Sequence, residues 1–447
     1  MSNRIIIDGV TVVTMNDNDD VHFDGSIVIE GDRIVASGDS QASSEYDRSG
    51  ATVIDGSGMV ALPGLVDLHY HTALGKGWSD HLPLWEYLQS CWYPLIRALD
   101  DDAAYWAAMS SYSESLKFGT TTVNDMYRLL PSLERAARDI GMRAVLCNDI
   151  AIDEENLDTL ADTEEAYREI QKTDDGLVEV RVGLEWLPLA SEELLRECRE
   201  LANELGIGMH IHLSESISEV EICETMYGKR PTEVAYDTGV LGPDCIAAHC
   251  VWMTDSDIAL LKETGTQVSH NPTSNAKLGN GVARLPEMLE AGLNVGLGHD
   301  AAECNNSRDM FQVMKWSSLI HRATRVDASL QQAPDVLRMA TRNGASALGH
   351  NTGELSAGKL ADVILIDINN QYFTPLMPES KEHLYSHLVF SAEGSCVDTS
   401  IVNGRIVRRS KEFLDVDEEE IRAKANEAFR GALNRMVVPD QYKYLSR

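Results

Sequence analysis

The middle of the chain alternates short apolar segments with helical stretches, and this alternation constrains the fold more than any other feature. Between about residues 63 and 350, apolar runs such as 144–146 and 246–248 are separated by helical segments such as 192–205. Strands that alternate with helices form a parallel sheet, and about eight such units over this length favour a closed (β/α)8 barrel. We therefore predict an α/β fold with a TIM-like catalytic barrel over residues 63–350.

Both ends of the chain have a different pattern, in which short strands lead into turns. Residues 5–7 precede Asp8-Gly9, residues 53–54 precede Asp55-Gly56, and similar apolar runs return at 362–367 and 400–407. These are hairpin signals. We predict one small β-sandwich module built from residues 1–62 and 351–412, followed by a C-terminal helical segment over 413–447.

Several predicted barrel strands end in histidine or aspartate. In chain order these residues are His69 and His71, His210 and His212, His249, His270 and Asp300. Residues i and i+2 of a strand share a face, so both imidazoles of a His-x-His pair can reach one point. The C-terminal strand ends of a TIM-like barrel surround its active site, and packing does not explain five strands that end this way. We predict a functional site there.

The residue types at these strand ends suit metal-assisted hydrolysis. Imidazoles and a carboxylate are good ligands for zinc and also suit ferrous iron, and a bound water becomes nucleophilic near neutral pH. Asp300 can contact the metal and accept the proton of the water, and His270 can stabilise developing charge on the substrate. Glu215, three residues after His212, can pass a proton to the substrate without being a ligand.

Four motifs extend beyond single residues. They are Pro63 to His71, His212 to Glu215, Ser269 to Gly281, and Gly298 to Asp300 with Asn305 to Ser307. In this order they resemble motifs of the amidohydrolase superfamily, and in particular of its deaminase and chlorohydrolase branch. The resemblance covers almost the whole chain and implies a hydrolase acting on C–N bonds of cyclic amidines.

The resemblance also implies roles for the strand-end residues. One divalent metal per chain, zinc in preference to iron, is implied to bind His69, His71, His212, His249 and Asp300. Glu215, His270 and Asp300 are implied to handle protons, which leaves His210 a structural role. Two-metal relatives commonly bridge their ions with a modified lysine after strand four, and residues 173–228 contain no lysine. A single metal is therefore expected.

Positions of the substrate pocket depart from the resemblance. Within the branch the chain is most similar to deaminases of S-adenosylhomocysteine and 5′-methylthioadenosine, which have a carboxylate where Ile96 stands and a histidine where Trp186 stands. Buried ribose hydroxyls pair poorly with apolar side chains. We therefore expect hydrolytic deamination of a free purine-, pterin- or pyrimidine-like heterocycle, with release of ammonia. Trp78, Glu185 and Trp186 are candidate substrate contacts.

Three alternatives stay open. The chain could act on S-adenosylhomocysteine or 5′-methylthioadenosine, or it could be a triazine-type amino- or chlorohydrolase. A third alternative is a non-catalytic barrel that serves as a binding subunit, but such a chain is expected to have lost a ligand or Glu215, and all are present. Ammonia release across a panel of heterocycles separates deamination from the other hydrolyses.

Charge and cysteine usage limit the partners and the compartment. The formal charge of −33 argues against nucleic acid and against an anionic membrane, because both would be repelled. The sequence has no apolar run of membrane-spanning length, no signal peptide and no C-x-x-C pair among its 8 cysteines. We expect a cytoplasmic homo-oligomer that acts on a small heterocyclic molecule. Its acidity fits either a salt-adapted host or an ordinary acidic cytosolic enzyme.

Overall fold

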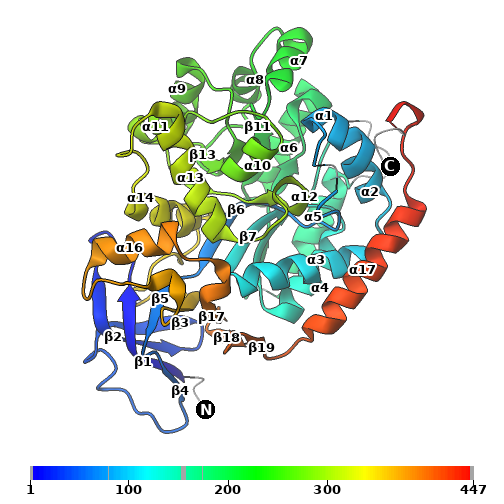
Figure 1. The fold of residues 1–447 in the computed structure, drawn as a ribbon. Coiled ribbons are helices and arrows are strands. Elements are labelled where there is room, and N and C mark those ends of the chain that lie inside the picture. The colour runs from blue at the N-terminus through cyan, green and yellow to red at the C-terminus, as the bar shows by residue number, and fades with distance from the viewer. Residues whose placement is uncertain (1–3, 79, 153–157, 174, 443–447) are drawn as a thin grey trace.

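The chain folds into a barrel surrounded by helices and a second sheet that lies beside the barrel (Figure 1). A computed structural model describes all residues except 1–3, 79, 153–157, 174 and 443–447. The second sheet is built from the blue N-terminal and the orange C-terminal parts of the chain, which come together although they are far apart in sequence.

The barrel consists of two five-stranded sheets, with the orders β15-β6-β7-β8-β9 and β10-β11-β12-β13-β14. The strands are β6 (Leu65–His71), β7 (Thr120–Met126), β8 (Arg143–Cys147), β9 (Val178–Val180), β10 (Val182–Leu184), β11 (Met209–Leu213), β12 (Cys245–His249), β13 (Gln267–His270), β14 (Val295–Leu297) and β15 (Asp300–Ala301). Within each sheet all paired strands are parallel. Since β9 leads directly to β10 and β14 leads to β15, the sheets close into the predicted TIM-like barrel.

Helices follow most of the barrel strands and cover the outside of the barrel. The longer ones are α3 (Asp101–Lys117), α4 (Leu130–Ile140), α5 (Leu160–Ile170), α6 (Glu192–Leu205), α7 (Ile217–Tyr227), α9 (Asp255–Thr264) and α13 (Met310–Arg325). Most of their starts follow ordinary capping chemistry: the side chain of Ser191, for example, accepts a hydrogen bond from the Leu194 backbone N–H. The predicted helix over 192–205 is therefore confirmed as α6.

The second sheet has nine strands drawn from both parts of the chain, in the order β19-β18-β17-β16-β5-β1-β2-β3, with β4 paired to β1. Its strands are β1 (Arg4–Val13), β2 (Val21–Glu30), β3 (Arg33–Asp39), β4 (Thr52–Asp55), β5 (Met59–Pro63), β16 (Val363–Asp367), β17 (Val397–Val402), β18 (Arg405–Arg409) and β19 (Glu412–Phe413). The two chain parts meet where β5 pairs antiparallel with β16.

The junction between this sheet and the barrel is tightly packed. Arg143 of β8 donates from Nε to Asp362, just before β16, over 2.7 Å, and both side chains are buried. Gly64 separates β5 from β6, and a Cβ atom there would lie 1.9 Å from Oγ1 of Thr121. The Pro-Gly step of the first motif is therefore explained by close packing against β7.

The C-terminal helix α17 (Glu418–Arg435) packs along α3 on the outside of the barrel. Its buried residues include Ile421, Ala428 and Ala432, which join the same apolar cluster as Ala104 and Leu116 of α3. None of the helices in the described part of the chain combines the length and apolar character that a bilayer crossing requires.

Candidate active site

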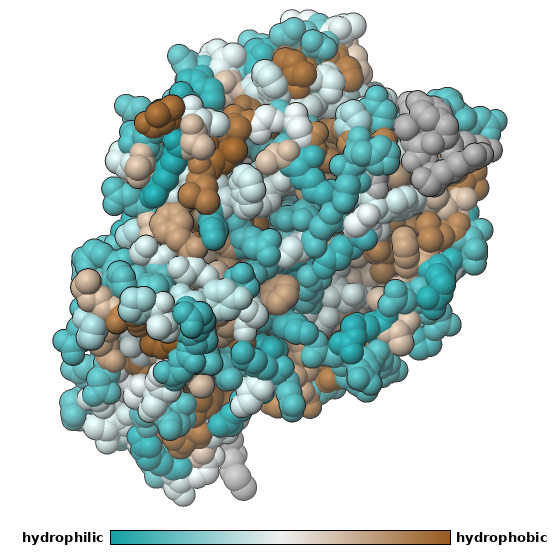
Figure 2. Space-filling model, in the orientation of Figure 1, coloured by the Kyte–Doolittle hydropathy of each residue, from teal (hydrophilic) through white to brown (hydrophobic). Residues whose placement is uncertain are grey.

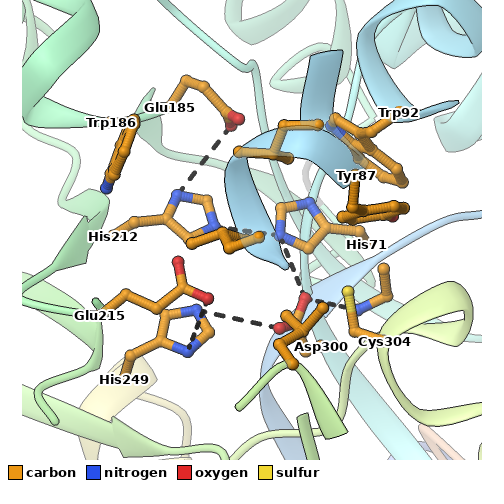
Figure 3. Close-up of a pocket in the computed structure, with 14 residues that line it drawn as sticks. His71, Tyr87, Trp92, Glu185, Trp186, His212, Glu215, His249, Asp300 and Cys304 are labelled. Carbon is orange, nitrogen blue, oxygen red and sulfur yellow. Dashed lines mark hydrogen bonds and ion pairs between the residues drawn. The ribbon is translucent and has the colours of Figure 1, made fainter. Parts of the chain in front are cut away.

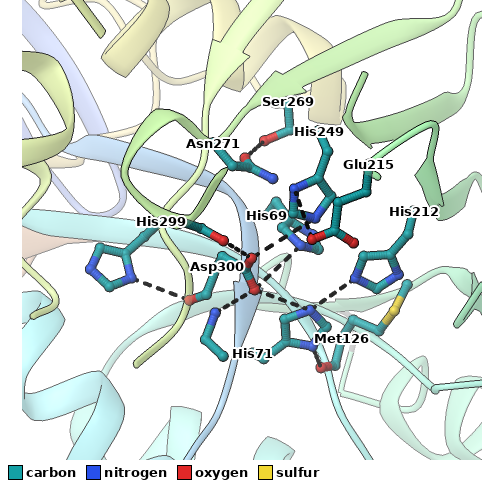
Figure 4. A network of polar contacts seen from close by, with 12 residues as sticks. His69, His71, Met126, His212, Glu215, His249, Ser269, Asn271, His299 and Asp300 are labelled. Carbon is teal, nitrogen blue, oxygen red and sulfur yellow. Dashed lines mark hydrogen bonds and ion pairs between the residues drawn. The ribbon is translucent and has the colours of Figure 1, made fainter. Parts of the chain in front are cut away.

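Five of the predicted side chains converge at the C-terminal mouth of the barrel (Figure 4). They are His69 and His71 of β6, His212 of β11, His249 of β12 and Asp300 of β15. Two overlapping groups, His69 with His71 and His212, and His69 with His249 and Asp300, each bring their ligand atoms within 4.8 Å of one another. All five side chains are buried.

The facing atoms are close enough to share one ion. The Nε2 atoms of His71 and His212 are 3.1 Å apart, and Oδ1 of Asp300 lies 3.7 Å from Nε2 of both His69 and His71. Nε2 of His249 lies 3.9 Å from the second oxygen of Asp300. With bonds of about 2.0–2.2 Å to one zinc ion, adjacent ligand atoms lie roughly 3 Å apart, so this spacing fits a single metal.

The chemical state of these imidazoles also fits metal binding. Nε2 of His69 and Nε2 of His249 are buried and have no hydrogen-bond partner among the described residues. Burial and the neighbouring imidazoles hold the pKa of His69 well below its usual range, and burial lowers the pKa of His71 to about 3. Neutral imidazole is the form that binds a metal.

The opposite nitrogens of the rings are fixed by hydrogen bonds. Nδ1 of His71 lies 2.6 Å from the Met126 carbonyl, and Nδ1 of His249 lies 2.8 Å from Oδ1 of Asn275. Such partners set the ring orientation and leave Nε2 for the metal. Both bonds therefore turn the free nitrogen toward Asp300.

His210 supports the site from behind. Its Nε2 lies 2.9 Å from Nδ1 of His69, and its Nδ1 lies 2.6 Å from the side-chain amide of Asn124 on β7. The ring is fully buried. This position agrees with the structural role predicted for His210 and explains why β11 contains a His-x-His pair.

The two strands that carry His71 and Asp300 are joined by a buried arginine. Arg308 donates to the backbone carbonyl of Asp300 over 2.9 Å and to that of His71 over 2.5 Å. Its guanidinium also lies over the Tyr70 ring, 3.9 Å from the centroid. Asp300 and His249 have φ values of 72° and 71°, a conformation that costs free energy in non-glycine residues and concentrates at functional sites.

A cavity opens directly onto the histidine cluster (Figure 3). Its walls combine aromatic and aliphatic side chains with two acids. The lining residues other than the predicted ligands are Leu84, Tyr87, Leu88, Trp92, Glu185, Trp186, Glu215, Leu278, Ala301 and Cys304. An apolar pocket with a few convergent polar groups is typical of a small-molecule site.

Glu215 occupies the position expected of a proton-transfer group. Its Oε1 accepts a hydrogen bond from Nδ2 of Asn280 over 2.7 Å and lies 3.8 Å from Nδ1 of His249. Its backbone N–H donates to the Glu219 carboxylate over 2.7 Å, which fixes the loop after β11. Burial, with smaller effects from Asp300 and Glu219, raises the pKa of Glu215 well above its usual range. The residue can therefore hold a proton inside the cavity.

Glu185 lies across the cavity from Glu215. Its Oε1 accepts a hydrogen bond from the Tyr93 hydroxyl over 2.9 Å, whereas its Oε2 has no partner among the described residues. Burial raises the pKa of Glu185 to about 7. Trp186 stands beside it and packs against Trp85, with ring centroids 5.6 Å apart. Two of the three candidate substrate contacts therefore line the cavity.

Other predicted positions lie outside this cavity. Trp78 packs against Phe429 of α17, with ring centroids 6.2 Å apart, and is not a lining residue. His270 is buried behind the cluster, where its Nε2 lies 3.1 Å from Nε2 of His321 on α13. Ile96 is also buried outside the lining.

Sequence reasoning missed part of the cavity wall. Leu84, Tyr87 and Leu88 come from the segment between β6 and α3, and Cys304 comes from the short helix α12 (Ala302–Asn305) after β15. The density of aromatic residues around Trp92 was the available signal, but that segment also reads as ordinary loop packing. Arg308, which joins two ligand strands, had no signal beyond its place after the last motif.

Comparisons with known proteins agree with this geometry. The model of the Amidohydrolase family matches residues 60–407. A 5′-deoxyadenosine deaminase of Methanosarcina barkeri is 36% identical over 97% of this chain and 99% of its own length. A 5-methylthioadenosine/S-adenosylhomocysteine deaminase of Thermoanaerobacter pseudethanolicus is 34% identical over 97% of this chain and 100% of its own length. The crystal structure of a Xanthomonas campestris adenosine deaminase with bound zinc has a TM-score of 0.90 and 26% identity, and covers 96% of this chain and 98% of that one.

Proposed function

The chain belongs to the amidohydrolase family, and we propose that it is a metal-dependent hydrolytic deaminase of an amino-substituted nitrogen heterocycle. The observation that carries this proposal is the contact of a buried cluster of four histidines and one aspartate with a cavity that contains Glu215. The names of the related deaminases support the same reaction class.

We assign the metal to His69, His71, His212, His249 and Asp300, with zinc as the favoured ion because the related Xanthomonas enzyme holds zinc. When bound, the metal supplies Lewis-acid activation of water. The buried, neutral imidazoles and the single carboxylate suit one divalent ion. Elemental analysis should find about one metal per chain, and a reproducible two per chain would contradict the assignment.

The chain's own groups divide the proton transfers. Asp300 accepts a proton from the attacking water at the carboxylate oxygen that faces the imidazoles and passes it to the departing amine, which leaves as ammonia. Glu215 gives a proton to a ring nitrogen of the substrate, so that the carbon bearing the amine becomes electrophilic. The remaining hydroxyl proton returns to Glu215 as the ring carbonyl forms. His270 remains our candidate for charge stabilisation, although it is not a lining residue and its Nε2 lies against Nε2 of His321.

For the substrate we propose a free purine-, pterin- or pyrimidine-like ring. The lining residues are mainly aromatic and aliphatic, and none of those described is lysine or arginine, so the carboxylate of an amino-acid substituent finds no counter-charge there. Ring stacking on Trp186 and Trp92 would supply binding area. Trp78 is a weaker candidate for a substrate contact, because it packs against Phe429 and does not line the cavity.

A nucleoside substrate is the second candidate, because the related deaminases are named for 5′-deoxyadenosine and for 5-methylthioadenosine or S-adenosylhomocysteine. A side-by-side kcat/KM panel separates the two. Our proposal predicts turnover of free bases and poor turnover of S-adenosylhomocysteine. Values above about 10⁵ M⁻¹s⁻¹ for the nucleosides, with none for free bases, would contradict it.

We further infer a cytoplasmic homo-oligomer. The 8 cysteines of the chain are all buried, and the absence of a disulfide framework suits a reducing compartment. The high negative charge favours a small-molecule partner over nucleic acid or an anionic membrane. Light scattering on the purified protein tests the oligomeric state.

A further inference from the structure

We propose that Glu185 selects heterocycles carrying a second N–H donor, in addition to the amine that leaves. The inference rests on the proposed deaminase function and deepens it, because it names the chemical edge that the ring must present. It concerns Oε2 of Glu185, which faces the cavity and is not used by any step described above.

Only one of the two carboxyl oxygens of Glu185 accepts a hydrogen bond from the described residues. Tyr93 donates to Oε1, but Oε2 is buried without a partner among the described residues, and the residue as a whole is only 4% exposed. A buried acceptor that lacks a hydrogen bond is costly, so a group that completes it on binding is strongly favoured. The lining side chains around it, such as Trp186 and Leu84, are largely apolar, and the described lining contains no cation to serve as that partner.

The two acids of the cavity address different edges of a flat ligand. Figure 3 shows Glu185 and Glu215 on opposite sides of the His212 ring. Glu215 is held next to His249 by Asn280, whereas Glu185 is held by Tyr93 from the segment before α3. A planar ring that turns one nitrogen toward Glu215 therefore presents another edge to Glu185. An N–H on that edge would donate to Oε2.

A competing role for Glu185 is to orient His212. Oε2 lies 4.0 Å from Nδ1 of His212, and neither atom has a hydrogen-bond partner among the described residues. This separation exceeds hydrogen-bond length, so the contact leaves Oε2 available to a ligand. The two roles differ in one measurable respect: a positioning residue affects all substrates alike, whereas a recognition residue affects only ligands that carry the donor.

The test uses three purines that share the reacting amine. 9-Methyladenine has no second N–H donor, adenine adds a ring N–H, and 2,6-diamino-9-methylpurine adds an exocyclic amine. Their dissociation constants are measured by calorimetry on metal-loaded Glu215→Gln protein, in which turnover is suppressed. We expect at least one donor-bearing purine to bind about 10- to 100-fold more tightly than 9-methyladenine, the range for a hydrogen bond to an acidic group.

Two substitutions at position 185, made in the same background, complete the test. Glu185→Leu should remove the preference while leaving the affinity for 9-methyladenine and the metal content nearly unchanged. Glu185→Gln keeps an oxygen for the Tyr93 hydroxyl and places an amide N–H toward the cavity, so it should disfavour the donor-bearing purines. Tyr93→Phe is the matched control, because it removes the neighbouring hydrogen bond but keeps the carboxyl group.

The outcomes separate this inference from the proposed function. Equal binding of the three purines, binding of none, or an equal loss for all of them in Glu185→Leu would overturn the role of Glu185. A preference that depends on Glu185, but without ammonia release from any heterocycle by the unmodified protein, would support Glu185 as a recognition residue and would overturn the deaminase proposal instead.

Discussion

At the scale of single residues, we propose that the site separates groups that hold a metal from groups that handle protons. His69, His71 and Asp300 face one another with Nε2 and carboxylate atoms, whereas Glu215 faces the cavity and is tied to Asn280. The strand-end positions and the three-residue step between His212 and Glu215 pointed to this site, and the resemblance to the amidohydrolase superfamily implied the division of roles. The ligand atoms need no rearrangement to surround one ion.

The first prediction concerns Glu215→Gln. The amide keeps an oxygen that can accept from Asn280, so the loop and the metal cluster should stay intact. The side chain can no longer transfer a proton, and kcat should fall by roughly 10²-fold or more. Steady-state kinetics with metal analysis measure both. A near-normal kcat would show that another group supplies the proton.

The sequence alone could not predict which side chains from distant parts of the chain contact one another in the barrel. His270 ends a strand like the other candidates, but its ring pairs with His321, which lies 51 positions further along the chain. Trp186 turns into the cavity, whereas Trp78 packs on α17. Strand positions follow from a period of two, but loop paths depend on tertiary packing that a single sequence does not reveal.

At the scale of elements, the barrel and the second sheet were predictable in type because their patterns differ. Strands alternate with helices in the middle of the chain, and hairpin signals dominate both ends. Two strands of the barrel are each divided into two short strands, β9 with β10 and β14 with β15, and no sequence pattern indicated these breaks. We propose the division into a module of 1–62 with 351–412, a barrel of 63–350 and a C-terminal segment of 413–447. The buried Arg143–Asp362 ion pair joins the module to the barrel.

The second prediction concerns the joint between β6 and β15. Arg308→Met should keep most of the packing on Tyr70 but lose both hydrogen bonds to the carbonyls of His71 and Asp300. We expect metal affinity to fall about 10- to 100-fold, as for other groups that orient ligands. Chelator competition measures this, with the exposed Arg325→Met on α13 as control. Unchanged affinity in Arg308→Met would contradict the role of this joint.

At the scale of the whole molecule, charge is the dominant surface property. The formal charge is −33, and Figure 2 shows a face on which hydrophilic side chains prevail, with small scattered apolar patches. Like charges at this density repel one another and oppose compact folding, and salt screens the repulsion. The acidic surface thus affects stability and solubility and is separate from the chemistry at the barrel mouth.

The third prediction concerns salt. If repulsion between surface acids limits stability, the unfolding temperature should rise steadily from low salt to molar KCl. Thermal unfolding followed by circular dichroism at several KCl concentrations measures the effect. A Tm that stays flat, or that falls with added KCl, would remove the interpretation of the charge as an adaptation to saline conditions.

The central claim is that a metal held by the histidine cluster is required to release ammonia from an amino-substituted heterocycle. The most direct measurement is ammonia release by one preparation assayed as purified, after removal of metal by a chelator, and after addition of one equivalent of zinc, across purine, pterin and pyrimidine substrates. We predict activity on at least one ring, its loss on chelation, and its recovery with about one zinc per chain. Ammonia release that persists in verified metal-free protein, or its absence from every heterocycle with the metal in place, would contradict the account.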